Sequence, residues 1–510
     1  MPINSIQLGL TLSLVIRFCF AQQVAPTAYA ETIDTLSARK HLEIIASDAF
    51  EGRETGKPGA DKAAEYIAAQ FRLLGLEAPV NQTYFQPVKL ASQHFSVDYF
   101  TIGNQEFLAD KDFLIIGQKS RQIVDTDEIL FIGAGINHKR FDDLKQLSIK
   151  DKVVLLLNEG ELSNNGGKCL SYILRQRPKL VLTVSSVADS LLKQLQKTTH
   201  AEVIKLSEDI QRINTNVSPT APTVIYLPPR VANRLLKPSG YTLQQLTAKI
   251  NARRTPLNFT IATAVHIAFG RKTVPIKGQN VLGYMEGTDK KAELLIITAH
   301  YDHIGVNPDG KINNGADDDG SGVTGVLEIA KAFAKAKQDG HGPRRSILFM
   351  TVTGEEKGLL GSNYYTRHPV FPLAYTIANL NIDMIGRIDP PHQSKVDYVY
   401  LVGSDKLSSI LHTISETANQ NYTKLSLDYT YNDPNDPEKI YYRSDHYNFA
   451  KHKIPVIFYF NGIHEDYHSP GDTIDKINFR LLTERAKLVF YTAWDLVNRN
   501  DRPIVDSNKK

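Results

Sequence analysis

The sequence predicts an α/β protein built around a mixed, mostly parallel sheet with helices packed against it. From residue 280 onward, short apolar runs typical of buried strands alternate with segments of helical periodicity. Between residues 110 and 271 short β-like runs and turns dominate instead. A chain of 510 residues, 42% of them hydrophobic, is long enough for two domains. We therefore expect an α/β domain that is interrupted by a smaller β-rich domain.

The elements follow from the spacing of apolar residues. Strands of the α/β domain are expected at 280–285, 294–299, 346–352, 377–382 and 455–460. Helices are expected where apolar residues recur at helical spacing, at 36–47, 60–74, 322–335, 358–365, 406–419 and 478–497. In the middle region, strands are expected at 128–132, 153–157, 180–185 and 223–227, and a helix at 243–250.

These elements divide the chain into segments. Residues 31–109 are expected to be the first part of the α/β domain, 110–271 the inserted domain and 272–500 the remainder. Residues 501–510 form a polar, flexible tail. A short insertion at 423–440 receives no role from the sequence.

The first thirty residues are predicted to form a signal peptide. Residues 8–20 are almost continuously apolar, but this run is too short to span a membrane. Ala30 closes a cleavage site of the small-x-small type, and Ala21 closes a second one. We therefore expect a secreted or periplasmic protein. No other apolar run is long enough for a membrane helix, so no stable membrane span is expected.

The charge and the cysteine content of the chain indicate neither a nucleic-acid partner nor a disulfide. The 59 basic and 55 acidic residues leave a net charge of +4, which is no reason to expect a nucleic-acid partner. The cysteines are Cys19 and Cys169. Because Cys19 is expected to leave with the signal peptide, no disulfide within the chain is expected.

Residues that can bind a metal follow successive strands of the α/β domain. They are His300, Asp318, the pair Glu355–Glu356, Asp383 and His468. Open α/β sheets carry their chemistry beyond the carboxyl ends of the strands, so these side chains are expected to meet. Two imidazoles and three carboxylates suit two divalent ions that share a bridging carboxylate. Each residue alone is more typical of a surface or a turn; their common placement predicts the metal site.

The spacing within the site suggests how roles are divided. Adjacent side chains of an extended segment point in opposite directions, so one of Glu355 and Glu356 is expected to bind metal and the other to act as general base. His300 and Asp302 can lie on the same side, so Asp302 is expected to accept the second ring N–H of His300. Four nearby histidines are not expected to bind metal: His303, His446, His452 and His464.

One competing motif lies in the same region. Residues 464–468 match the H-E-x-x-H pattern of a different class of zinc protease. That chemistry needs both histidines on one turn of a helix. Gly462 precedes the segment and Pro470 follows it, so a loop is predicted and this alternative is not favoured. The G-x-S-x-G elbow of serine hydrolases does not occur in the sequence.

Several segments, taken together, resemble a known family. They are AHYDH (299–303), NNGADDDGSG (313–322), TGEEKGLLGS (353–362), NIDMIGR (381–387), RSDHYNF (443–449) and YHSPGDT (467–473). Their residues and order resemble the co-catalytic two-zinc exopeptidases, which include secreted bacterial aminopeptidases, glutamate carboxypeptidase and the transferrin receptor. Residues 48–59 look like the opening of that family. The β-rich middle looks like an inserted protease-associated domain, and the resemblance implies the zinc exopeptidase fold.

The resemblance also implies a role for each residue of the site. One Zn²⁺ ion would be held by His300 and Asp383 and the other by Glu356 and His468, with Asp318 between them. Glu355 would move protons as the general base, Tyr467 would hydrogen-bond the developing oxyanion, and Asp302 would orient His300. Three further residues would line the substrate side: Ser444, Asp445 and His446. A cis peptide bond is expected between Asp318 and Asp319.

The function that follows is a zinc-dependent exopeptidase, a metallo-aminopeptidase that removes residues from the amino end of a peptide substrate. Three alternatives remain: a carboxypeptidase, a glutaminyl cyclase of the same fold, and a peptide-binding module without catalysis. All five expected ligands are present, which argues against a receptor that has lost its metals. No oligomeric state or preferred side chain is predicted from these residues.

Overall fold

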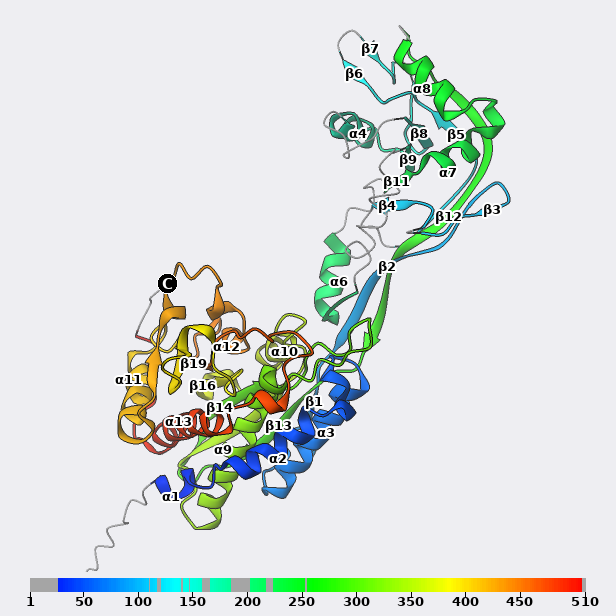
Figure 1. Ribbon diagram of the computed structural model, residues 1–510. Helices are drawn as coiled ribbons and strands as arrows, with labels where there is room; N and C mark the ends of the chain where they lie inside the picture. The colour runs from blue at the N-terminus through cyan, green and yellow to red at the C-terminus, as the bar shows by residue number, and fades with distance from the viewer. Residues whose placement is uncertain are drawn as a thin grey trace, which may run out of the picture.

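The computed structural model describes residues 26–109, 111–116, 121–138, 141–145, 147–157, 166–184, 202–216, 223–252 and 255–506. Most of the predicted signal peptide and the end of the predicted tail therefore lie outside the described residues. The chain forms two lobes joined by long strands (Figure 1). We call residues 26–87 and 279–506 the main lobe, and residues 90–276 the second lobe.

The main lobe is built around an eight-stranded sheet. In spatial order its strands are β1 (Phe85–Pro87), β13 (Gln279–Met285), β15 (Arg345–Val352), β14 (Lys290–His300), β16 (Thr376–Ile382), β19 (Val456–Phe460), β17 (Tyr398–Val402) and β18 (Ser426–Asp428). The four central strands, β15, β14, β16 and β19, are parallel, whereas β13 and β17 join them antiparallel. The predicted mixed, mostly parallel sheet is confirmed.

The central strands form where apolar runs are covered on both faces. Every residue of β15, β16 and β19 is buried, as expected for parallel strands between two helical layers. Alternate residues of β14 face opposite layers: Leu295 and Ile297 pack with the helices of one face, and Leu294 and Ile296 pack with those of the other. The five predicted strands therefore appear close to their expected limits.

Helices cover both faces of this sheet (Figure 1). The helices of the larger apolar layer are α1 (Thr27–Ala30), α2 (Thr35–Ile45), α3 (Pro58–Leu73), α9 (Gly322–Gln338), α11 (Ser409–Ala418) and α13 (Phe479–Asn498). The opposite layer contains α10 (Leu360–Arg367) and α12 (His446–Ala450). The local sequence determines where several helices begin, since Asp34 caps α2, Asn478 caps α13 and Pro58 begins α3. The six predicted helices of this lobe are confirmed.

The second lobe contains its own sheet. Its strands are, in order, β10 (Val203–Leu206), β2 (Leu90–Ile102), β12 (Phe259–Ile276), β5 (Gln122–Phe131), β8 (Val153–Leu156), β9 (Leu180–Val184), β11 (Thr223–Leu227) and β4 (Leu114–Ile116), with β3 (Gln105–Glu106) beside β2. The strands β2 and β12 run between the lobes (Figure 1). The sheet thus reaches beyond the predicted limits of 110–271. Its assignment as a protease-associated domain stays a prediction.

The two lobes touch where the second lobe meets α10. Arg367 of α10 pairs with Glu208 and Asp209 of α6 (Ser207–Asn216) at 2.6 and 2.9 Å. Leu360, at the start of α10, packs against buried residues of β2 and β10. The loop that begins α10 carries Glu355 and Glu356, so the contact between the lobes lies one short helix away from the predicted site.

The start of the described chain is part of the core. Tyr29 and Ala30 of α1 are buried at 4% and 1% exposure, and the Tyr29 ring stacks on Trp494 of α13 at 5.6 Å. Cleavage after Ala30, one of the two predicted positions, would remove this packing. Cleavage after Ala21, the other predicted position, would keep it.

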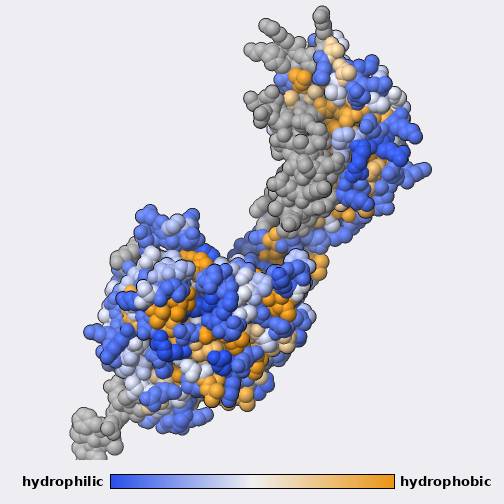
Figure 2. Space-filling model, in the orientation of Figure 1, coloured by the Kyte–Doolittle hydropathy of each residue, from blue (hydrophilic) through white to orange (hydrophobic). Residues whose placement is uncertain are grey.

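The length and polarity of the described helices can be compared with what a membrane span requires. On the visible face of the main lobe, apolar residues lie scattered among hydrophilic ones (Figure 2). Among the described residues, every helix is too short or too polar to cross a bilayer.

Candidate active site

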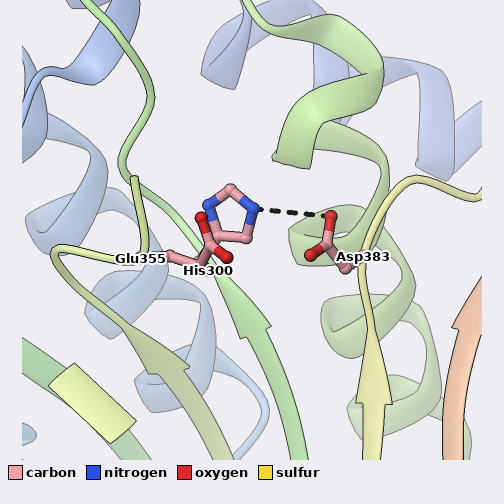
Figure 3. Close-up of side chains that lie close together, drawn as sticks. All are labelled: His300, Glu355 and Asp383. Carbon is pink, nitrogen blue, oxygen red and sulfur yellow. Dashed lines mark ion pairs between the residues drawn. The ribbon is translucent and has the colours of Figure 1, made fainter. Parts of the chain in front are cut away.

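Three of the predicted residues meet beyond the carboxyl ends of the central strands. His300 is the last residue of β14, Asp383 follows β16 directly, and Glu355 lies on the loop between β15 and α10. Figure 3 shows the three side chains pointing toward one another. Nε2 of His300 lies 3.5 Å from Oδ1 of Asp383, and one possible ligand atom from each of the three residues lies within 4.8 Å of the others.

The carboxylate of Asp318 lies between this cluster and a second one. Its Oδ1 is 3.2 Å from Nε2 of His300, and its Oδ2 is 3.1 Å from Nε2 of His468. The peptide bond between Asp318 and Asp319 is cis, as predicted. Each oxygen of Asp318 thus faces a different histidine, which is the arrangement that a bridging ligand needs.

The second cluster is built around Glu356. Its Oε2 lies 3.0 Å from Nε2 of His468, and its Oε1 lies 2.8 Å from Nδ1 of His303. His303 is fully buried, whereas 37% of the His468 side chain is exposed. His303 was not expected to bind metal, yet it shares a second group of possible ligands with Asp318 and Glu356. The signal that could have drawn attention to it is its place in AHYDH, three residues after His300.

These distances fit a pair of zinc ions. In a tetrahedral site with bonds of about 2.0–2.1 Å, neighbouring ligand atoms lie about 3.3 Å apart. The four separations from His300 and His468 to the surrounding carboxylates are 3.2, 3.5, 3.1 and 3.0 Å. The nitrogen and oxygen donors are also of the kind that zinc prefers. The residues present therefore fit the group that the sequence predicts.

The clustered charges shift the titration of the site in the metal-free protein. Burial, followed by repulsion from Asp383 and Glu356, raises the pKa of Glu355 well above its usual value, although His300 opposes this. Burial also acts to raise the pKa of Asp318, but the imidazoles of His303, His300 and His468 bring it well below its usual value. The protonated form of Glu355 is thus favoured relative to a free carboxyl group, and Asp318 is held as an anion.

Asp302 occupies a different position from the predicted one. Its carboxylate Oδ1 is 3.9 Å from Nδ1 of His300, and the partner of that nitrogen is instead the backbone carbonyl of Asp302, at 3.0 Å. The two carboxylate oxygens accept hydrogen bonds from the peptide N–H of Glu355 at 3.1 Å and from the hydroxyl of Thr55 at 2.7 Å. The prediction that the Asp302 carboxylate accepts the ring N–H of His300 is therefore corrected, because the chain turns so that its own carbonyl reaches the ring first.

The residues predicted to line the substrate side are buried. Ser444, Asp445 and His446 are exposed by no more than 1%. Ser444 donates to Oδ2 of Asp383 at 2.5 Å and accepts from Asn381 at 2.8 Å. Asp445 accepts from Ser362 at 2.5 Å. Ser444 therefore supports Asp383 from behind, whereas Oδ2 of Asp445 and both ring nitrogens of His446 are buried without a hydrogen-bond partner among the described residues.

A pocket opens beside the first cluster. About 350 Å³ of space there is free of atoms, part of it open to solvent, and the lining residues are His300, Asp318, Glu355, Asp383, Met384, Ile440, Arg443, Phe458, Phe460, Ile463 and Tyr467. Burial and nearby carboxylates raise the pKa of Tyr467, so its hydroxyl stays protonated and can donate. Nη2 of Arg443 approaches this hydroxyl at 3.4 Å. Ile440, at the end of the insertion that had no predicted role, forms part of the wall.

His464 of the H-E-x-x-H match is a supporting residue. It lies in a loop after β19, as expected, and its Nε2 is 3.2 Å from Oδ2 of Asp317. Asp472 accepts from the peptide N–H groups of Asp317 and Asp318 at 3.0 Å. These contacts hold the loop that carries Asp318, so the histidine pair of that motif does not meet at one centre.

A further supporting residue, Arg53, comes from the beginning of the chain. Its guanidinium is fully buried and donates to the backbone carbonyls of Tyr301, Ile45, Asn314 and Gly315 at 2.6–2.9 Å. The carbonyls of Tyr301, Asn314 and Gly315 belong to the strand end after His300 and to the loop that leads to Asp318, and that of Ile45 lies at the end of α2. Sequence reasoning assigned Arg53 no role, although its segment 48–59 was one of those that resembled the family.

Known proteins resemble the main lobe. Residues 280–493 match the family model described as Peptidase family M28. Aminopeptidase YwaD of Bacillus subtilis is 28% identical over 233 residues, which cover 44% of this chain and 46% of that protein. A probable leucine aminopeptidase of Arthroderma otae is 32% identical over 218 residues, covering 41% of this chain and 56% of that protein. The chain thus spans about half the length of these curated relatives.

Solved structures resemble a longer part of the chain. An aminopeptidase from Aneurinibacillus sp. strain AM-1 has a TM-score of 0.49 and 18% identity, covering 95% of this chain and 99% of the other. A zinc aminopeptidase from Bacillus subtilis has a TM-score of 0.46 and 18% identity, covering 94% and 99%. The segment 280–493, which contains every predicted ligand, is the part of the chain that matches peptidase family M28.

Proposed function

We propose that this protein is a zinc-dependent aminopeptidase that removes apolar residues from the amino end of peptides. The observation that carries the proposal is the pair of histidine–carboxylate clusters joined by Asp318, beside a pocket whose lining includes apolar residues. His300 and Asp383 would hold one zinc ion, Glu356 and His468 the other, and Asp318 both. Zinc at these positions would make a bound water acidic and polarise the scissile carbonyl.

The side chains of the pocket suggest how the rest of the reaction is divided. Glu355 lines the pocket and its raised pKa suits a group that accepts a proton from the attacking water and returns it to the leaving amine. The Tyr467 hydroxyl would donate a hydrogen bond to the carbonyl oxygen as negative charge develops there. Both groups line the same pocket as His300, Asp318 and Asp383, which supports a common peptide bond as their target.

The chemistry of the pocket also suggests which end of a peptide enters it. The carboxylates that line the pocket attract a free ammonium group, which the amino end of a peptide provides. The apolar lining residues, among them Met384, Phe458 and Ile463, suit an apolar first side chain. The names of two relatives, an aminopeptidase and a probable leucine aminopeptidase, agree with this direction.

The proposal also includes export of the protein and a role for its second lobe. The apolar run at 8–20 supports secretion or transfer to the periplasm. The second lobe has its own core, and we take it as an inserted protease-associated domain. The contact of this lobe with α10 through Arg367 supports a role in substrate access.

Product analysis by mass tests the proposal. The protein is incubated with added zinc and with matched peptides whose amino ends are free or acetylated, and with peptides that begin with glutamine. Stepwise loss of the first residue from free peptides alone supports an aminopeptidase. Shortening from the carboxyl end, loss of ammonia without shortening, or binding without turnover would overturn it in favour of a carboxypeptidase, a cyclase or a binding module.

A further inference from the structure

The segment that precedes the second lobe is joined to the candidate site by a series of contacts. The peptide N–H of His303 donates to the carbonyl of Arg53 at 3.1 Å, and that of Gly305 donates to the carbonyl of Gly52 at 3.0 Å. Gly52 has a φ of 63°, and a Cβ there would lie 2.4 Å from the carbonyl oxygen of Asn313. Residues 52–55 are therefore fitted closely against the loops that follow β14.

Within this segment, Thr55 contacts a carboxylate that also holds the loop of Glu355. It is 1% exposed, and its hydroxyl donates to Oδ2 of Asp302 at 2.7 Å. The other oxygen of Asp302 accepts from the peptide N–H of Glu355 at 3.1 Å. Both oxygens of this buried carboxylate are thus engaged, one by each neighbour, and the carboxylate cannot turn without losing one of the two bonds.

The loop that carries Glu355 needs such a restraint. It is entered through Gly354, whose φ of 70° is freely available only to glycine. Beyond Glu355, the carbonyl of that residue accepts from the N–H groups of Gly358 and Leu359 at 2.8 and 2.9 Å. The bond from the Glu355 N–H to Asp302 fixes the other side of the residue, so the direction of its side chain depends on how Asp302 is held.

We infer that Thr55 is a positioning residue for Glu355 and acts through Asp302. Its hydroxyl holds the Asp302 carboxylate in the one orientation that also receives the Glu355 N–H. Glu54 supports the same loop from outside, since its carboxylate pairs with Lys357 at 3.0 Å. The inference rests on the proposed function, in which Glu355 is the general base. It also means that residues 280–493, the part that matches the family model, lack one contact that completes the site.

The test compares Thr55→Val, which removes the hydroxyl at nearly constant volume, with Thr55→Ser, which keeps it. Thr492→Val is the matched control, because Thr492 is a buried threonine in α13 whose hydroxyl donates to Leu488 at 2.9 Å. A displacement of the base of about 1 Å lowers turnover up to ~100-fold. We expect Thr55→Val to lower kcat ~10- to 100-fold, with KM and bound zinc unchanged and Thr55→Ser close to the wild type.

A second measurement does not depend on activity. Amide hydrogen exchange of the peptide that covers residues 353–359, measured in the metal-free protein, reports the Glu355 N–H directly. We expect faster exchange there in Thr55→Val, and no change in Thr55→Ser or Thr492→Val. Unchanged exchange, or a loss of zinc that parallels the loss of kcat, would overturn the inference. If the wild type hydrolyses no peptide, the proposed function fails while the exchange result still decides whether Thr55 holds this loop.

Discussion

The hydroxyl of Ser444 donates a hydrogen bond of 2.5 Å to Oδ2 of Asp383, and both groups are buried. The bond continues a chain in which Asn381 donates to Ser444, and Thr298 donates to Asn381. This chain fixes the direction of the Asp383 carboxylate before any metal binds. Hydrogen bonds behind a metal ligand commonly contribute 10- to 100-fold in affinity.

Ser444→Ala is therefore expected to weaken zinc binding at one of the two positions by about 10-fold or more, because Asp383 becomes free to rotate. Competition with a chelator of known affinity measures this change. Ser415→Ala is the control, since Ser415 is equally buried and hydrogen-bonded but lies on α11. Equal zinc affinity in wild type and Ser444→Ala would show that Asp383 does not need the serine.

Glu355→Gln tests the general base. The substitution keeps the size of the side chain but removes its ability to accept a proton, so kcat is expected to fall ~10²- to 10⁴-fold with zinc content unchanged. Glu43→Gln, an exposed change on α2, controls for the charge removed. Kinetics and metal analysis of the same preparation measure both effects. Retained turnover in Glu355→Gln would remove this residue as the base.

Replacement of each of the two histidines next to Glu356 is expected to change zinc binding in a different way. His468 reaches Oδ2 of Asp318 and Oε2 of Glu356, whereas His303 is buried behind Oε1 of Glu356. We expect His468→Ala to bind one zinc ion per chain in place of two, and His303→Asn to bind two with lower affinity. Metal analysis after equilibrium dialysis counts the ions. The reverse pattern would show that His303 is the ligand.

A buried histidine outside the metal site predicts the pH dependence of stability. Burial lowers the pKa of His446 from 6.5 to about 3. The unfolded chain therefore binds a proton at this residue below pH 6.5 and the folded protein does not, so stability is lost as the pH falls from 6.5 toward 3, by up to about 1.4 kcal/mol per pH unit.

His446→Leu is expected to make this loss shallower. Urea unfolding of the metal-free protein and the variant at pH 7, 6 and 5 measures it, because the difference between the two proteins isolates residue 446. His266→Leu, at an exposed position of β12, is the control. Identical slopes for the wild type and His446→Leu would show that His446 titrates normally in the folded state.

The packing of Tyr29 predicts where the natural chain begins. A chain that starts at Gln22 keeps the stack of Tyr29 on Trp494, and one that starts at Glu31 loses it. Removing a buried aromatic side chain costs about 3–5 kcal/mol. We therefore expect the longer form to be more stable by about that amount in urea unfolding, and the protein recovered from its source to retain Tyr29. A natural amino end at Glu31 would contradict this.

The strands of the main sheet could be predicted because each of them is marked by its own short apolar run. Strands such as β15 and β16 are short apolar runs covered on both faces, and such runs can be recognised one at a time. The strands β2 and β12 were missed because they leave the core and run between the lobes, so buried and exposed residues do not alternate regularly along them. Their length depends on the partner strand rather than on the local pattern.

The side chains of the candidate metal site were predicted to meet, whereas Arg53 and Thr55, which support their loops, were not identified. His300, Asp318, Asp383 and His468 follow strands or loops whose order along the chain already implies that they meet. Arg53 and Thr55 act on partners about 250 residues away, and Arg53 donates mainly to backbone carbonyls, which leave no mark in the sequence. Ser444 was expected to line the substrate side, and its contact with Asp383 was missed because that partner can be identified only after the sheet is assembled.

The most direct test of the central claim follows the release of the first residue while zinc is added to the metal-free protein. Two peptides are used, identical except that one is acetylated at the amino end. Our account predicts no hydrolysis without zinc, activity that rises until two equivalents are bound, and no hydrolysis of the acetylated peptide. Hydrolysis in the absence of metal, or equal hydrolysis of both peptides, would contradict it.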